Sequence, residues 1–471
     1  MSDGRGSWLA TKLYYGAGSV AYGVKDNGFS YFLLLYYNQV LGLPAEWVGA
    51  AIMLSLVFDA ISDPIVGYSS DNLHSRWGRR HPFMYGSVVP VALSYYLLWN
   101  PPAGLGQGAL FGYLLALAIL VRTFITFYEI PSSSLVAELT DDYDERTSML
   151  SYRYFFGWWG GLSMAVTAWF LLLRPTPEYP VGQLNPEGWQ SYGLIASAVI
   201  VLAILVSSIG THRHIPFLRQ PPEKRPFSAR RSALELKETL SNRSFLVLFI
   251  SAIFGAMAAG LITSLNIYFT TYFWELKPTQ IGILTLGPFI SSVIALVVSP
   301  ALSRRFGKKP GAVLIGMLAA ILAPTPIVGR LLGLMPPNGS AALVPTLFVF
   351  SVIEVSLVII MSILVSSMVA DIVEESELRT GRRSEGVFFA ARSFIGKAVH
   401  GIGVMTATVL LAAIEFPQGA KPGEVDPGIV VNLGLVYVPS VFVVYMISVL
   451  FVAAYRISRA SHQENLDRLA T

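Results

Sequence analysis

Twelve apolar runs, each long enough to cross a bilayer, constrain this chain more than any other feature. A membrane-spanning helix needs about 20 mostly apolar residues. Because 54% of the residues are hydrophobic and only 13% are charged, the chain is too apolar for a soluble globular protein. We therefore expect an all-α integral membrane protein with twelve transmembrane helices. The runs lie at 14–41, 47–68, 82–100, 109–137, 150–173, 190–209, 243–273, 279–302, 310–333, 341–371, 386–413 and 430–456.

Positive charges are distributed unevenly over the loops between these runs. The even-numbered loops hold nineteen lysines and arginines, whereas the odd-numbered loops hold only Arg174, Lys277 and Lys421. The positive-inside rule assigns the side with more cations to the cytoplasm. We therefore expect the even loops and both termini in the cytoplasm, in a plasma membrane or a bacterial inner membrane. The net charge of +4 is then a topology signal, and we expect no nucleic-acid partner.

The longest polar stretch lies midway along the chain, at residues 211–242. It contains four prolines and many of the cations, which is typical of a linker on the cytoplasmic side. This predicts an N-terminal six-helix bundle at 1–210 and a C-terminal six-helix bundle at 243–471.

Two segments of the first half recur in the second half at nearly one offset. Residues 134–147 read SLVAELTDDYDERT, and residues 367–380 read SMVADIVEESELRT, 233 residues later. Residues 76–80 (RWGRR) recur as residues 305–309 (RFGKK), 229 residues later. Because each half has an even number of spans, the repeat is parallel, about an axis along the membrane normal. Halves of this kind rock about a cavity at the bilayer midplane.

The loop after the second run reads GYSSDNLHSRWGRR at residues 67–80. It resembles the signature between helices two and three of the major facilitator superfamily, which implies the two-bundle transporter fold. In that superfamily the acid and the arginines hold the cytoplasmic gate shut. The resemblance therefore implies a gating role for Asp71 with Arg76, Arg79 and Arg80. The alternative is that the arginines only set topology at the lipid headgroups.

Two carboxylates lie within the second run. Charged side chains at bilayer depth are costly and mark functional sites by default. Asp59 and Asp63 stand at i and i+4, which places them on one helix face about 6 Å apart along the axis. Like charges this close do not both ionise cheaply, so either one carboxyl holds a proton or a cation sits between them. Hard oxygen ligands suit a small cation such as Na⁺, and a proton is equally permitted.

The fourth run carries Arg122, Thr126 and Glu129 at i, i+4 and i+7, again on one helix face. These side chains can face the same cavity as the two aspartates. Arg122 has two readings of equal weight. It contacts a substrate, or it neutralises Glu129 or an aspartate of the second helix as a structural ion pair.

The segments LVFDAISDPIVG at 56–67 and TFYEIP at 126–131 resemble the melibiose permease group, the glycoside-pentoside-hexuronide cation symporters. The resemblance covers most of the chain. It places Asp59, Asp63 and Thr126 on the family's cation-site residues. It also implies that Arg153 on the fifth helix and Lys397 on the eleventh contribute to substrate binding.

The departures from this family fall on the sugar side. Gly23 stands where melibiose permease has a sugar-binding aspartate, with Lys25 and Asp26 in the next turn. Glu129 replaces the second sugar-binding aspartate, and Ser133 stands where a stacking tryptophan is found. Arg122 replaces a glycine. Fewer acids and one more cation suit a substrate with negative charge, such as a hexuronide, a sulfate ester or a phosphate. The alternative is that the fixed guanidinium near the aspartates substitutes for the coupling cation and leaves a uniporter.

We therefore expect a secondary transporter, not an enzyme, that carries a small solute together with Na⁺ or H⁺. Its partners are then the solute, the coupling cation and the lipid bilayer, with no resident cofactor, and we expect a monomer. A carrier of lysolipids from the same family remains the alternative within transport. A membrane-embedded enzyme, a channel and a transport-dead receptor are the rivals of other classes. The common zinc, phosphate-binding and serine-nucleophile motifs are absent from the sequence, which contains no cysteine.

Overall fold

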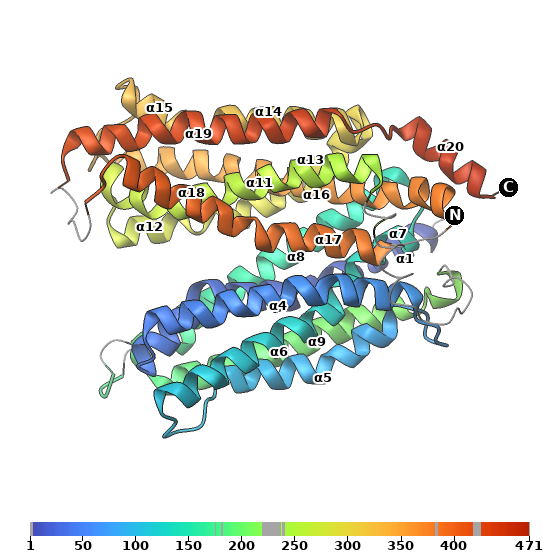
Figure 1. The fold of residues 1–471 in the computed structure, drawn as a ribbon, viewed down its shortest axis with the longest axis horizontal. Helices are drawn as coiled ribbons and strands as arrows, with labels where there is room; N and C mark the ends of the chain where they lie inside the picture. Colours follow the sequence, from blue (N-terminus) through green and yellow to red (C-terminus); the bar gives the residue numbers. More distant parts are fainter. Residues whose placement is uncertain are drawn as a thin grey trace. The chain divides into compact units, whose positions relative to one another are not determined.

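The computed structural model describes residues 3–174, 176–179, 182–218, 237, 241–381, 385–417 and 425–470. All regular secondary structure within these ranges is helical (Figure 1). Helices suit a bilayer because they satisfy their backbone hydrogen bonds internally. The chain divides into two compact units. Unit 1 contains Met1–Thr239, Val373–Phe394 and Arg468–Thr471, and unit 2 contains Leu240–Ile372 and Ile395–Asp467.

Unit 1 is built around long helices that run side by side in Figure 1, with α6 between α4 and α5, and α5 against α9. Helices α1 and α2 pack on α8. Asparagine and aspartate side chains cap several starts, as at α8, where Asp142 accepts the backbone N–H groups of Asp144 and Glu145. Its helices are α1 (Asp3–Ala17), α2 (Ser19–Asn27), α3 (Leu33–Leu35), α4 (Ala45–Asn72), α5 (His81–Leu98), α6 (Gln107–Ser134), α7 (Val136–Leu139), α8 (Tyr143–Thr167) and α9 (Pro186–His212).

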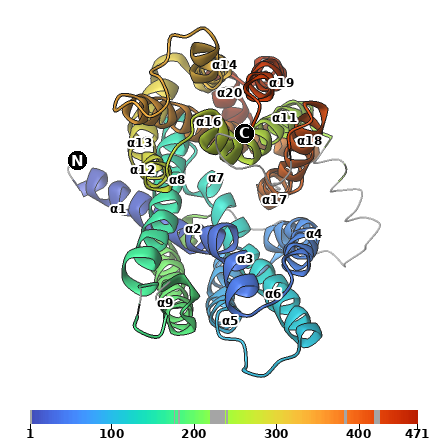
Figure 2. The ribbon, with the colours of Figure 1, turned by 90° about the vertical axis from the view of Figure 1, so that its left-hand side faces the viewer.

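Unit 2 repeats this all-helical build. Helix α11 contacts α18 and α19, and α14 contacts α13 and α19. Figure 2 shows these helices close to end-on. They are α11 (Arg243–Tyr268), α12 (Pro278–Leu284), α13 (Gly287–Phe306), α14 (Lys308–Leu322), α15 (Thr325–Leu331), α18 (His400–Ala413) and α19 (Pro427–Ala453). Three helices have residues in both units: α16 (Leu343–Thr380), α17 (Glu385–Ala398) and α20 (Arg459–Ala470).

Nine helices within the described ranges are long and apolar enough to cross a membrane, which makes the chain a multi-pass membrane protein. The runs at 14–41, 82–100 and 386–413 do not yield such a helix. The first is divided by π-helical turns at Gly28–Phe32 and Tyr36–Val40, and the last is divided between α17 and α18 at Val399. The number of twelve spans and the cytoplasmic termini therefore stay predictions.

Aromatic side chains from the first run, the end of α5 and the start of α9 form a cluster in unit 1. Trp99 stacks on Trp189 with their ring centroids 5.5 Å apart, and Tyr192 meets Trp99 edge-on at 4.8 Å. Phe32 and Tyr36 from the irregular end of the first run pack against Trp189. The Tyr36 hydroxyl donates to the backbone carbonyl of Trp99 at 3.1 Å. This contact anchors the irregular segment to the ends of α5 and α9.

Helices α2 and α8 cross at a point where both have glycine. A β-carbon on Gly23 would collide with the carbonyl oxygen of Gly157, and one on Gly161 would lie 2.6 Å from the carbonyl oxygen of Gly23. The position that holds a sugar-binding aspartate in melibiose permease therefore has no room for a side chain in this chain. Its glycine serves the close packing of two helices.

We expect Gly23→Ala to destabilise the protein by about 1–3 kcal/mol, because the added methyl group overpacks this crossing. The measurement is thermal unfolding of the purified protein. Gly86→Ala is the matched control, since a β-carbon at Gly86 on α5 meets nothing within 4 Å. Equal unfolding temperatures for the two variants would contradict the prediction.

Candidate functional site

The two aspartates of α4 point into unit 1. Asp59 and Asp63 are both fully buried, whereas Phe58, Ile61 and Ile65 are more than half exposed on the opposite side of the helix. Helix α6 covers the acidic face, and the two helices are in extensive contact. The sequence prediction that both acids share one interior face agrees with this geometry.

Thr126 on α6 bridges the two carboxylates. Its hydroxyl oxygen lies 3.0 Å from Asp59 Oδ1 and 2.9 Å from Asp63 Oδ1. The hydroxyl has one hydrogen and can donate it to only one of these oxygens at a time. Three oxygen atoms, one from each of these side chains, therefore lie close together at a buried point.

Arg122, one turn before Thr126, contacts the other oxygen of Asp59. Its Nη1 lies 3.3 Å from Asp59 Oδ2, and its guanidinium carbon lies 4.7 Å from the centre of the Phe29 ring. The side chain is buried, and its Nε has no hydrogen-bond partner among the described residues. Of the two readings from sequence, the geometry matches the pairing with an aspartate of α4. A substrate contact for Arg122 stays a prediction.

Arg153 on α8 occupies a second polar site. Its guanidinium donates to the Ser132 hydroxyl at 3.1 Å and to the Ser133 hydroxyl at 2.7 Å, and it lies 5.0 Å above the Tyr22 ring. Its Nη2 also lies 3.3 Å from the backbone carbonyl of Glu129. Ser133, which stands in place of a stacking tryptophan, thus holds a buried cation in this chain. The side chain of Glu129 is half-buried.

Lys25, Asp26 and Lys397 are the remaining predicted substrate residues. Lys25 on α2 is buried and forms an ion pair with its neighbour Asp26, whose own side chain is 57% exposed. Lys397 lies in α17, but its side chain is outside the described part of the structure. The assignment of these three residues to substrate binding stays a prediction.

A buried cluster of arginines and carboxylates lies near the C-terminal ends of α4 and α6. We call Asp71, Arg79, Arg80, Glu138 and Glu385 the arginine–carboxylate cluster. Glu138 Oε1 lies 3.1 Å from Arg79 Nη2 and 2.8 Å from Arg80 Nε. Glu385 Oε2 lies 3.0 Å from Arg79 Nη2 and 3.1 Å from Arg80 Nη2. Both carboxylates therefore bridge both arginines.

Asp71 joins this cluster to the first turn of α17. Its carboxylate lies 2.6 Å from Arg80 Nη2 and accepts the backbone N–H groups of Gly386 and Val387 at 3.0 and 3.2 Å. A carboxylate at a helix N-terminus satisfies otherwise unpaired amides and faces the positive end of the helix dipole. A β-carbon on Gly386 would lie 2.5 Å from the carbonyl oxygen of Gly67, so the approach needs glycine.

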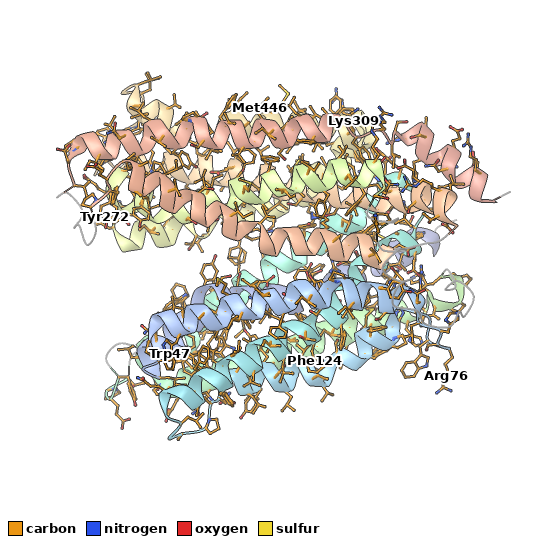
Figure 3. All side chains as sticks on the ribbon, viewed as in Figure 1. Trp47, Arg76, Phe124, Tyr272, Lys309 and Met446 are labelled. Atoms are coloured by element: carbon orange, nitrogen blue, oxygen red, sulfur yellow. The ribbon has the colours of Figure 1, made fainter. Side chains whose placement is uncertain are left out.

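Arg76, predicted as a gating residue with the others, lies outside the arginine–carboxylate cluster. Its side chain is exposed, and its guanidinium carbon is 5.9 Å from the Trp77 ring. Figure 3 shows it projecting away from the helices. Only Asp71, Arg79 and Arg80 of the predicted set come together.

The sequence repeat is reflected in equivalent ion pairs. Lys308 corresponds to Arg79 and Asp371 to Glu138, and Lys308 Nζ lies 2.8 and 2.6 Å from the two carboxylate oxygens of Asp371. Pro300 stands at the position that corresponds to Asp71. The second repeat therefore keeps a pair of a basic and an acidic side chain at these positions, as Lys308 and Asp371. It has a proline where the first repeat has the acid that caps α17.

Sequence reasoning missed Glu138 and Glu385. The repeat contained a signal for Glu138, because the acid recurs as Asp371 beside a second basic loop. Glu385 had no comparable signal, since it lies 305 residues from Arg80 in the chain. A contact across such a separation follows only from the fold.

The comparisons with known proteins agree with this architecture. The model of the family "MFS/sugar transport protein" matches residues 14–459. An uncharacterized symporter of Synechocystis sp. is 27% identical over 89% of this chain and 88% of its own length. The isoprimeverose transporter of Lactiplantibacillus pentosus is 26% identical over 82% and 76%. The sphingosine-1-phosphate transporter MFSD2B of Mus musculus is 26% identical over 92% and 87%.

A solved structure shows the same fold at low sequence identity. The proton:xylose symporter XylE, of the major facilitator superfamily, is 14% identical and has a TM-score of 0.65, with 99% of each chain covered. The prediction of an all-helical major facilitator fold is confirmed.

Proposed function

Because the chain belongs to the MFS/sugar transport protein family, we propose that it carries a sugar or glycoside across the membrane by alternating access, coupled to a small cation. The relatives are symporters and sugar transporters, and they support transport over the enzyme, channel and receptor alternatives. In this proposal twelve helices form two parallel six-helix halves, with both termini in the cytoplasm.

The observation that carries cation coupling is the hydroxyl of Thr126 between two buried carboxylates. The hydroxyl has one hydrogen for two acceptor oxygens, and it is neutral, so it does not itself balance the charge of two buried acids. A proton or a small hard cation at this point would compensate the two acids. We assign Asp59, Asp63 and Thr126 to the cation site on this basis.

The basic side chains nearby favour an acidic solute. Arg153 carries a permanent positive charge beside the C-terminal part of α6. The two hydroxyl groups to which it donates, those of Ser132 and Ser133, are neutral. A carboxylate, sulfate ester or phosphate on a sugar would form charge-assisted hydrogen bonds with such a guanidinium. Hexuronides and other anionic glycosides are therefore the proposed substrate class.

The second candidate is an amphiphile such as a lysolipid. MFSD2B supports it, because that relative is named for the transport of a phosphorylated sphingoid lipid. Both candidates carry a negatively charged group, a carboxylate, sulfate ester or phosphate on the sugar and a phosphate on the lipid. Arg153 could bind either in the same way.

An uptake screen in proteoliposomes tests the proposal. Radiolabelled glucuronide, a neutral β-glycoside and lysophosphatidic acid are offered separately, each with a Na⁺ gradient, a proton gradient or neither. We expect accumulation of the glucuronide against its gradient when a cation gradient is present. Accumulation of lysophosphatidic acid alone would select the lipid candidate, and no accumulation under any condition would overturn the proposal.

We expect Arg153→Ala to weaken binding of the accumulated acidic solute by about 10- to 100-fold, because a buried charge-assisted hydrogen bond contributes about 1.5–3 kcal/mol. Arg174→Ala is the control, since Arg174 is bonded to the backbone carbonyl of Phe170 at the end of a span. The measurement is the solute concentration at half-maximal uptake. Unchanged affinity in Arg153→Ala would remove this arginine from the substrate site.

A further inference from the structure

Arg122 brings a permanent positive charge into direct contact with the candidate cation site. Its Nη1 is 3.3 Å from Asp59 Oδ2, while the other oxygen of the same carboxylate, Oδ1, is 3.0 Å from the Thr126 hydroxyl. A guanidinium does not lose its charge in proteins. Asp59 is therefore compensated on one oxygen before any external cation arrives.

Aromatic packing holds the guanidinium in place. Its carbon lies 4.7 Å from the centre of the Phe29 ring, and Phe29 is itself buried in the core of unit 1. Burial strengthens a cation–π contact because the cation is desolvated. Two elements therefore hold the positive charge beside Asp59. Helix α6 carries Arg122, and the π-helical turn Gly28–Phe32 carries the ring against which the guanidinium packs.

The pairing differs from a structural ion pair elsewhere in this chain. Arg146 contacts Glu374 through both terminal nitrogens and both carboxylate oxygens. Arg122 makes a single nitrogen–oxygen contact with Asp59, and its Nε has no hydrogen-bond partner among the described residues. Arg122 thus lies where a counter-ion to Asp59 would lie. It is held by one contact with the carboxylate, whereas Arg146 is held to Glu374 by two.

We propose that Arg122 is a tethered cation that sets the ion selectivity of this site by excluding Na⁺. The inference rests on the proposed function, in which Asp59, Asp63 and Thr126 form the cation site. A Na⁺ among their three facing oxygens would lie within a few ångströms of the guanidinium, and repulsion between like charges at that range weakens binding on the order of 100-fold. Transport in this chain is then independent of Na⁺.

Binding of radioactive ²²Na⁺ to the purified full-length protein tests the inference without any solute. We expect no saturable binding to the wild type in the concentration range used. We expect saturable binding to Arg122→Gly, with an affinity at least 100-fold above the upper bound for the wild type. Arg122→Lys keeps the charge and should stay without binding. Asp63→Asn added to Arg122→Gly should abolish the gained site. Arg122→Gln serves as a second neutral variant if the glycine variant does not fold.

The outcomes separate the two proposals. Equal Na⁺ affinity in the wild type and in both neutral variants overturns the inference, as does a failure of folded Arg122→Gly and Arg122→Gln to gain binding. Either result, found in a protein that still accumulates solute, leaves the proposed function intact. A protein that accumulates no solute, while Arg122→Gly gains Na⁺ binding, overturns the proposed function instead.

Discussion

Asp63→Asn is expected to reduce cation-driven accumulation of solute to the level of empty vesicles. The substitution keeps the shape of the side chain and removes one of the two charges that a coupling cation would compensate. It also leaves the Arg122–Asp59 contact intact, so no buried guanidinium loses its partner. Asp59→Asn should abolish accumulation as well, at a larger cost in stability for that reason.

The measurement is uptake in proteoliposomes with an imposed cation gradient, beside exchange of solute at equal concentrations on both sides. Asp467→Asn is the matched control, because Asp467 is exposed on α20, where it contacts Gln463. Concentrative uptake by Asp63→Asn equal to that of the control would refute the assignment of the cation site.

The second large effect is expected in the arginine–carboxylate cluster. Replacing Arg79 and Arg80 by glutamine leaves the buried acids Glu138 and Glu385 without the guanidinium groups that they bridge. Breaking a buried pair by removing one partner costs about 3–5 kcal/mol. If the cluster holds the cytoplasmic gate shut, the equilibrium should shift by at least 100-fold toward the open form.

Cysteine accessibility measures this shift, since the sequence contains no cysteine to interfere. Val387→Cys is a suitable reporter, because Val387 is buried beside Asp71 in the first turn of α17. We expect fast labelling in the Arg79→Gln/Arg80→Gln background and slow labelling in the Arg76→Gln background, as Arg76 lies outside the cluster. Slow labelling in both backgrounds would leave the arginines with a topological role alone.

The general plan of the molecule could be predicted from the sequence because bilayers impose simple rules. Apolar runs indicate helices, and the membrane location and the family are confirmed by the fold and the comparisons. The shared face of Asp59 and Asp63 followed from helical periodicity, since residues at i and i+4 project from the same side. The role of these residues in coupling stays a prediction.

Other features could not be read from the chain because they depend on contacts between distant segments. Periodicity cannot reveal that Gly23 lies against Gly157, or that Gly386 lies against the carbonyl oxygen of Gly67. The contact of Arg122 with Asp59 also depends on how α6 packs against α4. Irregular turns at Gly28–Phe32 and Tyr36–Val40 divide the first run although its composition is continuous.

The exchange of Asp71 for Pro300 between the repeats has a consequence for how the two basic loops can be used. A proline has neither a carboxylate to hold amides at a helix start nor an amide hydrogen of its own. In unit 2 the Lys308–Asp371 pair therefore has no carboxylate at the position equivalent to Asp71 that could accept the backbone N–H groups of a helix start. A graft of residues 71–80 onto positions 300–309 would thus put a carboxylate where unit 2 has a proline, whereas the reverse graft would remove the carboxylate that accepts the backbone N–H groups of Gly386 and Val387.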